Sequence, residues 1–135
     1  MRHRLEKLKK AAKYEGMDAV LITSGINQMY LTGFAFSGYL LICPDSAYII
    51  TDPRYSEAAR GQVGAEYTVV VPDTSRVQLV KNLMWENSVT SLGYEDTELT
   101  CADFAALKKN YPDTVFLPLG SLLHTHREIK DETEL

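Results

Sequence analysis

The 135 residues, 45% hydrophobic and 24% charged, have room for one compact domain with its own core. A net charge of −4 argues against a general nucleic-acid-binding surface, although six of the fourteen Lys and Arg residues lie between Arg2 and Lys13. No apolar stretch approaches the roughly 20 residues of a membrane span. Two cysteines, Cys43 and Cys101, are too few for a disulfide framework and suit a reducing compartment. We therefore expect a cytoplasmic protein with no membrane or nucleic-acid partner.

The beginning of the chain predicts a helix, a buried strand and a short helical turn. Apolar residues recur at three- and four-residue spacing over residues 2–15, among Lys and Arg. Residues 18–23 form an apolar run typical of a buried strand. Asn27 can cap one helical turn through Leu31, and Gly33 can end that turn.

A β-hairpin and a capped helix are predicted next. The apolar runs 39–43 and 47–51 are separated by a Pro-Asp-Ser turn, which indicates antiparallel strands. Asp52 can accept a backbone N–H as N-cap, and Pro53 suits the first helical position. A helix through about Arg60 follows from this pattern.

Strand and helix alternate in the rest of the chain. We expect strands at residues 67–71, 89–94 and 114–117, a helix over 77–84 after capping candidates at 73–75, and a helix from Thr100 through Lys109. The predicted fold class is α/β, with a mixed β-sheet flanked by helices.

The chain lacks the common catalytic motifs. It contains no phosphate-binding glycine loop and no nucleophile elbow. His124 and His126 have the spacing of residues on one face of a strand, but two histidines without a nearby third ligand are more often surface residues. We predict no metal ligand and no catalytic residue in this chain.

Two other segments are candidate sites. Asp52, Arg54 and Tyr55 could orient a charged ligand at a strand-to-helix turn, but capping, local pairing and packing explain them better. Residues 35–38 form a loop in which the Phe36 ring either is exposed for contact or folds back on its own domain. The sequence leaves both interpretations of Phe36 open.

Several motifs in a fixed order resemble the N-terminal domain of the creatinase/prolidase superfamily. They lie at residues 17–22, 27–34, 51–55, 92–95 and 127–132, with Gly38 and an apolar strand between the second and third. The matching motif residues, which we expect to be mainly structural, are Asn27, Tyr30, Gly33, Phe34, Asp52, Arg54 and Tyr55.

The resemblance implies a ribonuclease H-like mixed sheet at residues 1–127. Residues 128–135 would begin a linker helix to a C-terminal catalytic domain of the pita-bread fold. In the family, that second domain holds two divalent metal ions, usually manganese or cobalt, and cleaves Xaa-Pro peptides. None of its ligand or catalytic motifs matches a position in this sequence. The resemblance therefore implies no cofactor in this chain and an inactive domain on its own.

The resemblance also implies an indirect role for the domain. In relatives it helps to form a homodimer, and a loop of one subunit walls the active site of the other. The matching loop here consists of Ala35, Phe36, Ser37 and Gly38, and it would restrict the length of short peptides. Family members often carry charged residues in this loop, whereas this chain has none there.

Two alternatives remain at this stage. The same architecture occurs in peptidase-like proteins that have lost catalysis and bind protein partners. A free-standing α/β domain with a ligand site at a topological switch in its sheet is the second alternative. The choice between an Xaa-Pro dipeptidase and an aminopeptidase P also stays open.

Overall fold

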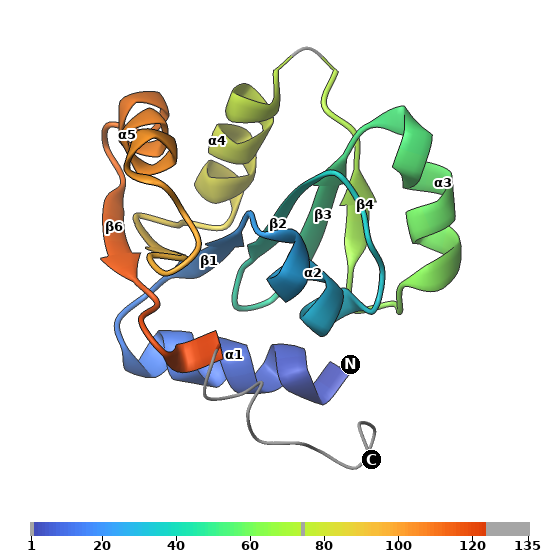
Figure 1. Cartoon of the computed structure of the whole chain (residues 1–135), viewed down its shortest axis with the longest axis horizontal. Helices are drawn as coiled ribbons and strands as arrows, with labels where there is room; N and C mark the ends of the chain where they lie inside the picture. Colours follow the sequence, from blue (N-terminus) through green and yellow to red (C-terminus); the bar gives the residue numbers. More distant parts are fainter. Residues whose placement is uncertain (1, 74, 124–135) are drawn as a thin grey trace.

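The computed structural model describes residues 2–73 and 75–123, and the predictions for His124, His126 and residues 128–135 lie outside them. One six-stranded mixed sheet runs through the molecule in the order β4-β3-β2-β1-β5-β6 (Figure 1). The strands are β1 (Ala19–Ile22), β2 (Gly38–Ile42), β3 (Ala47–Thr51), β4 (Thr68–Val70), β5 (Ser91–Tyr94) and β6 (Val115–Pro118). The helices are α1 (Arg2–Tyr14), α2 (Gly25–Thr32), α3 (Pro53–Gln62), α4 (Arg76–Glu86) and α5 (Cys101–Asn110). The predicted α/β class is confirmed.

Strand β1 lies in the middle of the sheet, where the pairing changes from antiparallel to parallel. Val20 pairs with Ile42 of the antiparallel β2 and with Gly93 of the parallel β5. The hairpin of β2 and β3 is antiparallel, as predicted. The edge strands are parallel to their neighbours: β4 pairs with β3, and β6 pairs with β5.

Helices cover both faces of the sheet, so all four residues of β1 are buried. Val20 and Ile22 belong to the core that includes Leu5 and Leu8 of α1. Ala19 and Leu21 belong to the opposite core. That core also contains Leu41, Val80, Leu83 and Leu107. In Figure 1, α1 and α2 lie apart from α4 and α5 across the sheet. The sequence period of two within β1 thus divides its side chains between two cores.

Helix boundaries follow from side-chain caps. Asp52, Ser75 and Thr100 each accept a backbone N–H at the start of a helix, as the sequence predicts. The prediction for Asn27 is wrong, because Ser24 is the N-cap of α2 and its hydroxyl accepts from the Asn27 N–H at 3.3 Å. Gly33 ends α2 with a left-handed φ of 75°.

The helices that follow the parallel strands β1 and β5 lie on opposite faces of the sheet. The chain leaves β1 into α2, whose Leu31 lies in the core with α1. It leaves β5 toward α5, whose Leu107 lies in the other core. A crevice is expected where such helices diverge, at the carboxyl ends of the two strands. Within the described residues, no helix is long and apolar enough to cross a membrane.

A substitution of Gly38, at the start of β2, tests how closely the hairpin strands are packed there. Its φ is 148°, and a Cβ there would overlap the carbonyl oxygen of Ile50. We expect Gly38→Ala to lower the free energy of unfolding by about 2 kcal/mol or more, because the backbone at residue 38 and the carbonyl group of Ile50 must both shift. Chemical denaturation measures this change. The control is Gly25→Ala, which meets no atom within 4 Å, and an equal loss in both variants would contradict the prediction.

Candidate functional site

Buried polar side chains gather around α2 and the loop that follows it. Those buried within the described residues are Arg4, Asn27, Gln28, Thr32, Thr51, Ser56 and Glu95. All except Ser56 lie on α2 or form hydrogen bonds with α2, its N-cap or its loop. Burial of a polar group costs free energy unless its hydrogen bonds are made. Buried polar contacts thus fix the position of α2 and of residues 33–38.

Glu95, the first residue after β5, links that strand to α2. Its side chain is 2% exposed. The carboxylate accepts backbone N–H groups of Thr23 at 2.5 Å and Ser24 at 2.9 Å. It also accepts the hydroxyls of Thr23 at 3.2 Å and Ser24 at 2.5 Å, and the Asn27 Nδ2 group at 2.6 Å. Five donors and the positive end of the α2 dipole thus compensate one buried charge.

The sequence indicated Glu95 only as part of a strand-end motif. Its partners lie 68 to 72 residues earlier in the chain, so local spacing gave no sign of the contact. The available signal was an acidic residue directly after one buried strand, together with a Thr-Ser pair directly after another. Parallel neighbours would bring these two strand ends together.

Buried side chains fix the loop at residues 33–38 at both ends. Gln28 Nε2 donates to the carbonyl of Gly38 at 2.8 Å and to that of Ile22 at 3.2 Å. Thr51 Oγ1 donates to the carbonyl of Ser37 at 2.7 Å. At the other end, Thr32 Oγ1 accepts from the Phe34 N–H at 3.1 Å. The loop backbone is thus tied to α2 and β3.

The Phe36 ring takes a position between the two alternatives left by the sequence. It is half-buried against the core that contains α1 and stacks on Phe34, with ring centroids 6.1 Å apart. Ala35 and Ser37 on either side are exposed. The loop therefore presents one partly covered aromatic ring between two small exposed residues.

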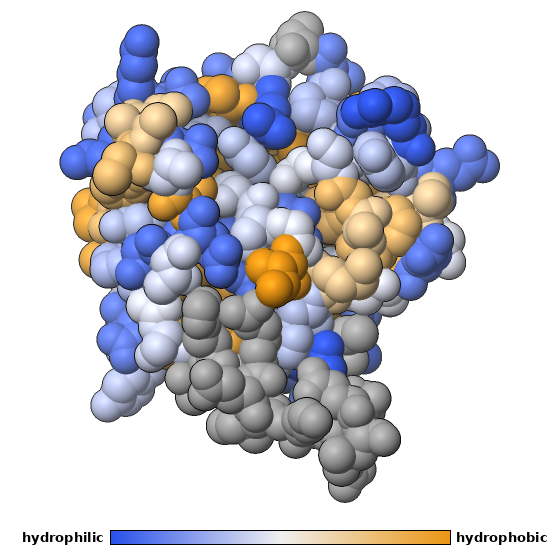
Figure 2. Space-filling view, viewed as in Figure 1, coloured by the Kyte–Doolittle hydropathy of each residue, from blue (hydrophilic) through white to orange (hydrophobic). Residues whose placement is uncertain are grey.

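Hydrophobic side chains are exposed beside this loop. Ile26 is 58% exposed and Met29 is 45% exposed, one helical turn apart on α2. Figure 2 shows hydrophobic groups over the region of α2 and the segment after it, surrounded by more hydrophilic surface. Neighbouring exposed apolar residues, next to a loop whose backbone is held by hydrogen bonds, are typical of a contact surface.

Asp52, Arg54 and Tyr55 form a local group at the start of α3. Asp52 accepts the Arg54 N–H at 2.9 Å and pairs with its guanidinium at 2.8 Å. The hydrogen bond from the Arg54 side chain holds the pKa of Asp52 below its usual range. The Arg54 guanidinium also lies 5.5 Å from the centre of the Tyr55 ring. These contacts satisfy the group internally.

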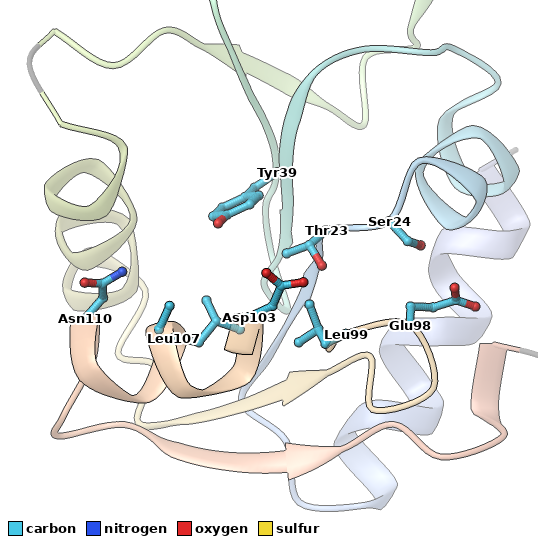
Figure 3. A pocket seen from close by; sticks show the side chains of 9 residues that line it. Thr23, Ser24, Tyr39, Glu98, Leu99, Asp103, Leu107 and Asn110 are labelled. Atoms are coloured by element: carbon cyan, nitrogen blue, oxygen red, sulfur yellow. The ribbon is translucent and has the colours of Figure 1, made fainter. Parts of the chain in front are cut away.

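A pocket lies at the carboxyl ends of β1 and β5, where the helices diverge. Its volume is about 280 Å³, and it is lined by Thr23, Ser24, Tyr39, Glu98, Leu99, Asp103, Ala106, Leu107 and Asn110. Figure 3 shows the Asp103 carboxylate and the Thr23 hydroxyl directed into the space below the Tyr39 ring. Sequence reasoning missed this pocket, although it noted that a topological switch could hold a ligand.

The described residues provide no site of the kind that a metal hydrolase uses. No three His, Cys, Asp or Glu side chains in residues 2–73 and 75–123 come together to hold a metal ion. His3, the one histidine within these ranges, lies on α1 and is exposed.

Comparison with known proteins agrees with this architecture. The family model described as "Creatinase/Prolidase N-terminal domain" matches residues 4–129. The chain is 32% identical over 133 residues to the "Uncharacterized peptidase YqhT" of Bacillus subtilis (strain 168), covering 98% of this chain and 37% of that protein. The chain thus spans little more than a third of this curated relative.

Two solved structures show the same fold. An Xaa-Pro dipeptidase from Bacillus anthracis superposes with a TM-score of 0.88 at 29% identity, covering 98% of this chain and 37% of that one. The N-terminal domain of the cytoplasmic peptidase PepQ from Mycobacterium tuberculosis H37Rv superposes with a TM-score of 0.77 at 28% identity, covering 91% of this chain and 97% of that one. The second structure is of a comparable domain by itself.

Removal of the Glu95 charge tests the link between β5 and α2. In Glu95→Gln, the amide N–H₂ group would face donors whose hydrogen bonds the carboxylate now accepts. We therefore expect a loss of about 2–4 kcal/mol in the free energy of unfolding. Urea denaturation of this chain measures the loss. The matched control is Glu86→Gln on the exposed end of α4, with an expected change within about 0.5 kcal/mol. Similar values for the two variants would refute a special role for Glu95.

Proposed function

The chain belongs to the creatinase/prolidase N-terminal domain family, and on that premise we propose that it is the non-catalytic N-terminal domain of a proline-specific metallopeptidase. The parent enzyme is either an Xaa-Pro dipeptidase or an aminopeptidase P. The similarity to the Xaa-Pro dipeptidase of Bacillus anthracis supports this class, and the 37% coverage of that chain supports the role of one domain in a longer protein. The PepQ relative, which is described as a cytoplasmic peptidase, supports the same location for the parent.

In this proposal, catalysis belongs to a C-terminal domain. A two-metal hydrolase needs several converging carboxylate and imidazole ligands, which hold the ions and lower the pKa of a bridging water. The described residues offer no such cluster, so they do not fit the pair of manganese or cobalt ions that the family implies. The contribution of this chain is then structural: it shapes access to a site held elsewhere.

The loop at residues 35–38 would provide that contribution. We propose that it walls the active site of the partner subunit in a homodimer and limits the length of Xaa-Pro peptides that enter. The observation that carries this proposal is the attachment of the loop backbone by Gln28 and Thr51, because a wall can select by shape only if it does not yield. Phe36 and its small neighbours carry no charge, so selection would rest on shape and apolar contact.

A second candidate is a protein-binding module in a peptidase-like protein that has lost catalysis. Exposed Ile26 and Met29 favour a contact surface on α2, which both functions could use. The two candidates differ in whether the parent hydrolyses peptides.

The test compares this chain with its full-length parent on an Xaa-Pro dipeptide and a longer Xaa-Pro peptide, with manganese present. We expect activity in the parent alone. Phe36→Ala in the parent should raise kcat/KM for the longer peptide relative to the dipeptide, because a wall residue is removed. The control is Phe104→Ala, which removes another half-buried ring. Phe104 lies on α5, and its ring stacks on that of Tyr94 with centroids 4.4 Å apart.

Each other outcome has a definite meaning. Metal-dependent cleavage by this chain alone would contradict a non-catalytic domain. An active parent whose length preference is unchanged by Phe36→Ala would contradict the wall. A folded parent without activity would favour the protein-binding module.

A further inference from the structure

The pocket between the ends of β1 and β5 is lined by hydroxyl, carboxylate and apolar side chains. It lies at a topological switch, the place where open α/β sheets most often bind ligands. The loop at residues 35–38 is not among its lining residues. The pocket is therefore separate from the loop that we propose to restrict access to a peptidase active site.

Glu95 decides what the hydroxyls of the pocket can do. Thr23 Oγ1 and Ser24 Oγ each direct their one proton to the Glu95 carboxylate. A hydroxyl whose proton is committed in this way has only lone pairs left for a ligand. The rim of the pocket at β1 is consequently a hydrogen-bond acceptor.

The opposite side of the pocket adds a negative charge. Asp103, in the first turn of α5, is exposed and directs its carboxylate into the same space as Thr23 (Figure 3). An ionised carboxylate also only accepts hydrogen bonds. Acceptors on these two sides favour a ligand that donates, and the charge of Asp103 favours a cation.

Apolar groups limit the size of that ligand. Leu99, Leu107 and Ala106 line the pocket between its polar sides, and they suit a short aliphatic stem. The Tyr39 ring is covered by the guanidinium of Arg76, 4.0 Å from its centre, so the positive end of a ligand belongs at Asp103 and away from Tyr39. A volume of about 280 Å³ suits a molecule the size of an amino acid.

We propose that this pocket binds a small organic cation with N–H donors, an alkylammonium or alkylguanidinium group on a short apolar stem. Its N–H groups donate to Asp103 and Thr23, and its stem lies along Leu99 and Leu107. Because Glu95 holds the hydroxyl protons, the same residue that joins β5 to α2 also selects a donor over an acceptor.

The experiment is a titration of this 135-residue chain, followed by the amide signals of Thr23, Tyr39, Asp103 and Asn110 in NMR spectra. The probe is n-butylammonium. n-Butyltrimethylammonium has the same charge and no N–H donor, and n-butanol has the same stem and no charge. We expect saturable shifts with the first probe and at least roughly tenfold weaker binding of the other two, since each lacks part of a charge-assisted hydrogen bond.

Variants test the position of the cation. Asp103→Asn should weaken n-butylammonium binding roughly tenfold, whereas Asp113→Asn, an exposed acid after α5, should leave it unchanged. No saturable shift, equal binding of the three probes, or unchanged affinity in a folded Asp103→Asn variant would each overturn the proposal. If Asp103→Asn does not fold, the comparison of probes on the unaltered chain still decides it.

Discussion

The arrangement of α2 and of the loop that follows it depends on one interaction, the buried carboxylate of Glu95 with its hydrogen-bond donors. It accepts hydrogen bonds from Thr23, Ser24 and Asn27, which together form the transition from β1 to α2. A charge in this position is tolerated only because all of its donors are in place. The end of β5 therefore sets where α2 begins, although the two are far apart in the sequence.

This constraint extends to both sides of the sheet. On one side, α2 carries Gln28, whose amide holds the loop that begins β2, and Thr51 completes the attachment from β3. On the other side, the hydroxyls that bind Glu95 become acceptors in the pocket near Asp103. One buried charge thus connects the position of a proposed access loop with the ligand chemistry of a separate pocket. Neither feature needs a catalytic group in this chain.

The sequence predicted those parts of the fold that depend on neighbours along the chain. The caps at Asp52 and Thr100 were predictable because their hydrogen bonds join residues two and three positions apart. The hairpin was predictable because a tight turn connects its two strands. The motif order also indicated the family, which the family model confirms. The cap of α2 was misassigned to Asn27 because the side chain of that residue is used by Glu95, 68 residues away. The attachment of the loop and the switch-point pocket likewise depend on strand order, which local patterns do not determine.

We infer that buried polar contacts hold residues 33–38 as rigidly as the sheet. Backbone ¹⁵N relaxation of this chain measures that rigidity directly. We predict order parameters of about 0.85 for the loop, equal to those of β2 and β3. Order parameters below about 0.6 in the loop, with a rigid sheet, would show that the hydrogen bonds from Gln28 and Thr51 do not fix the loop.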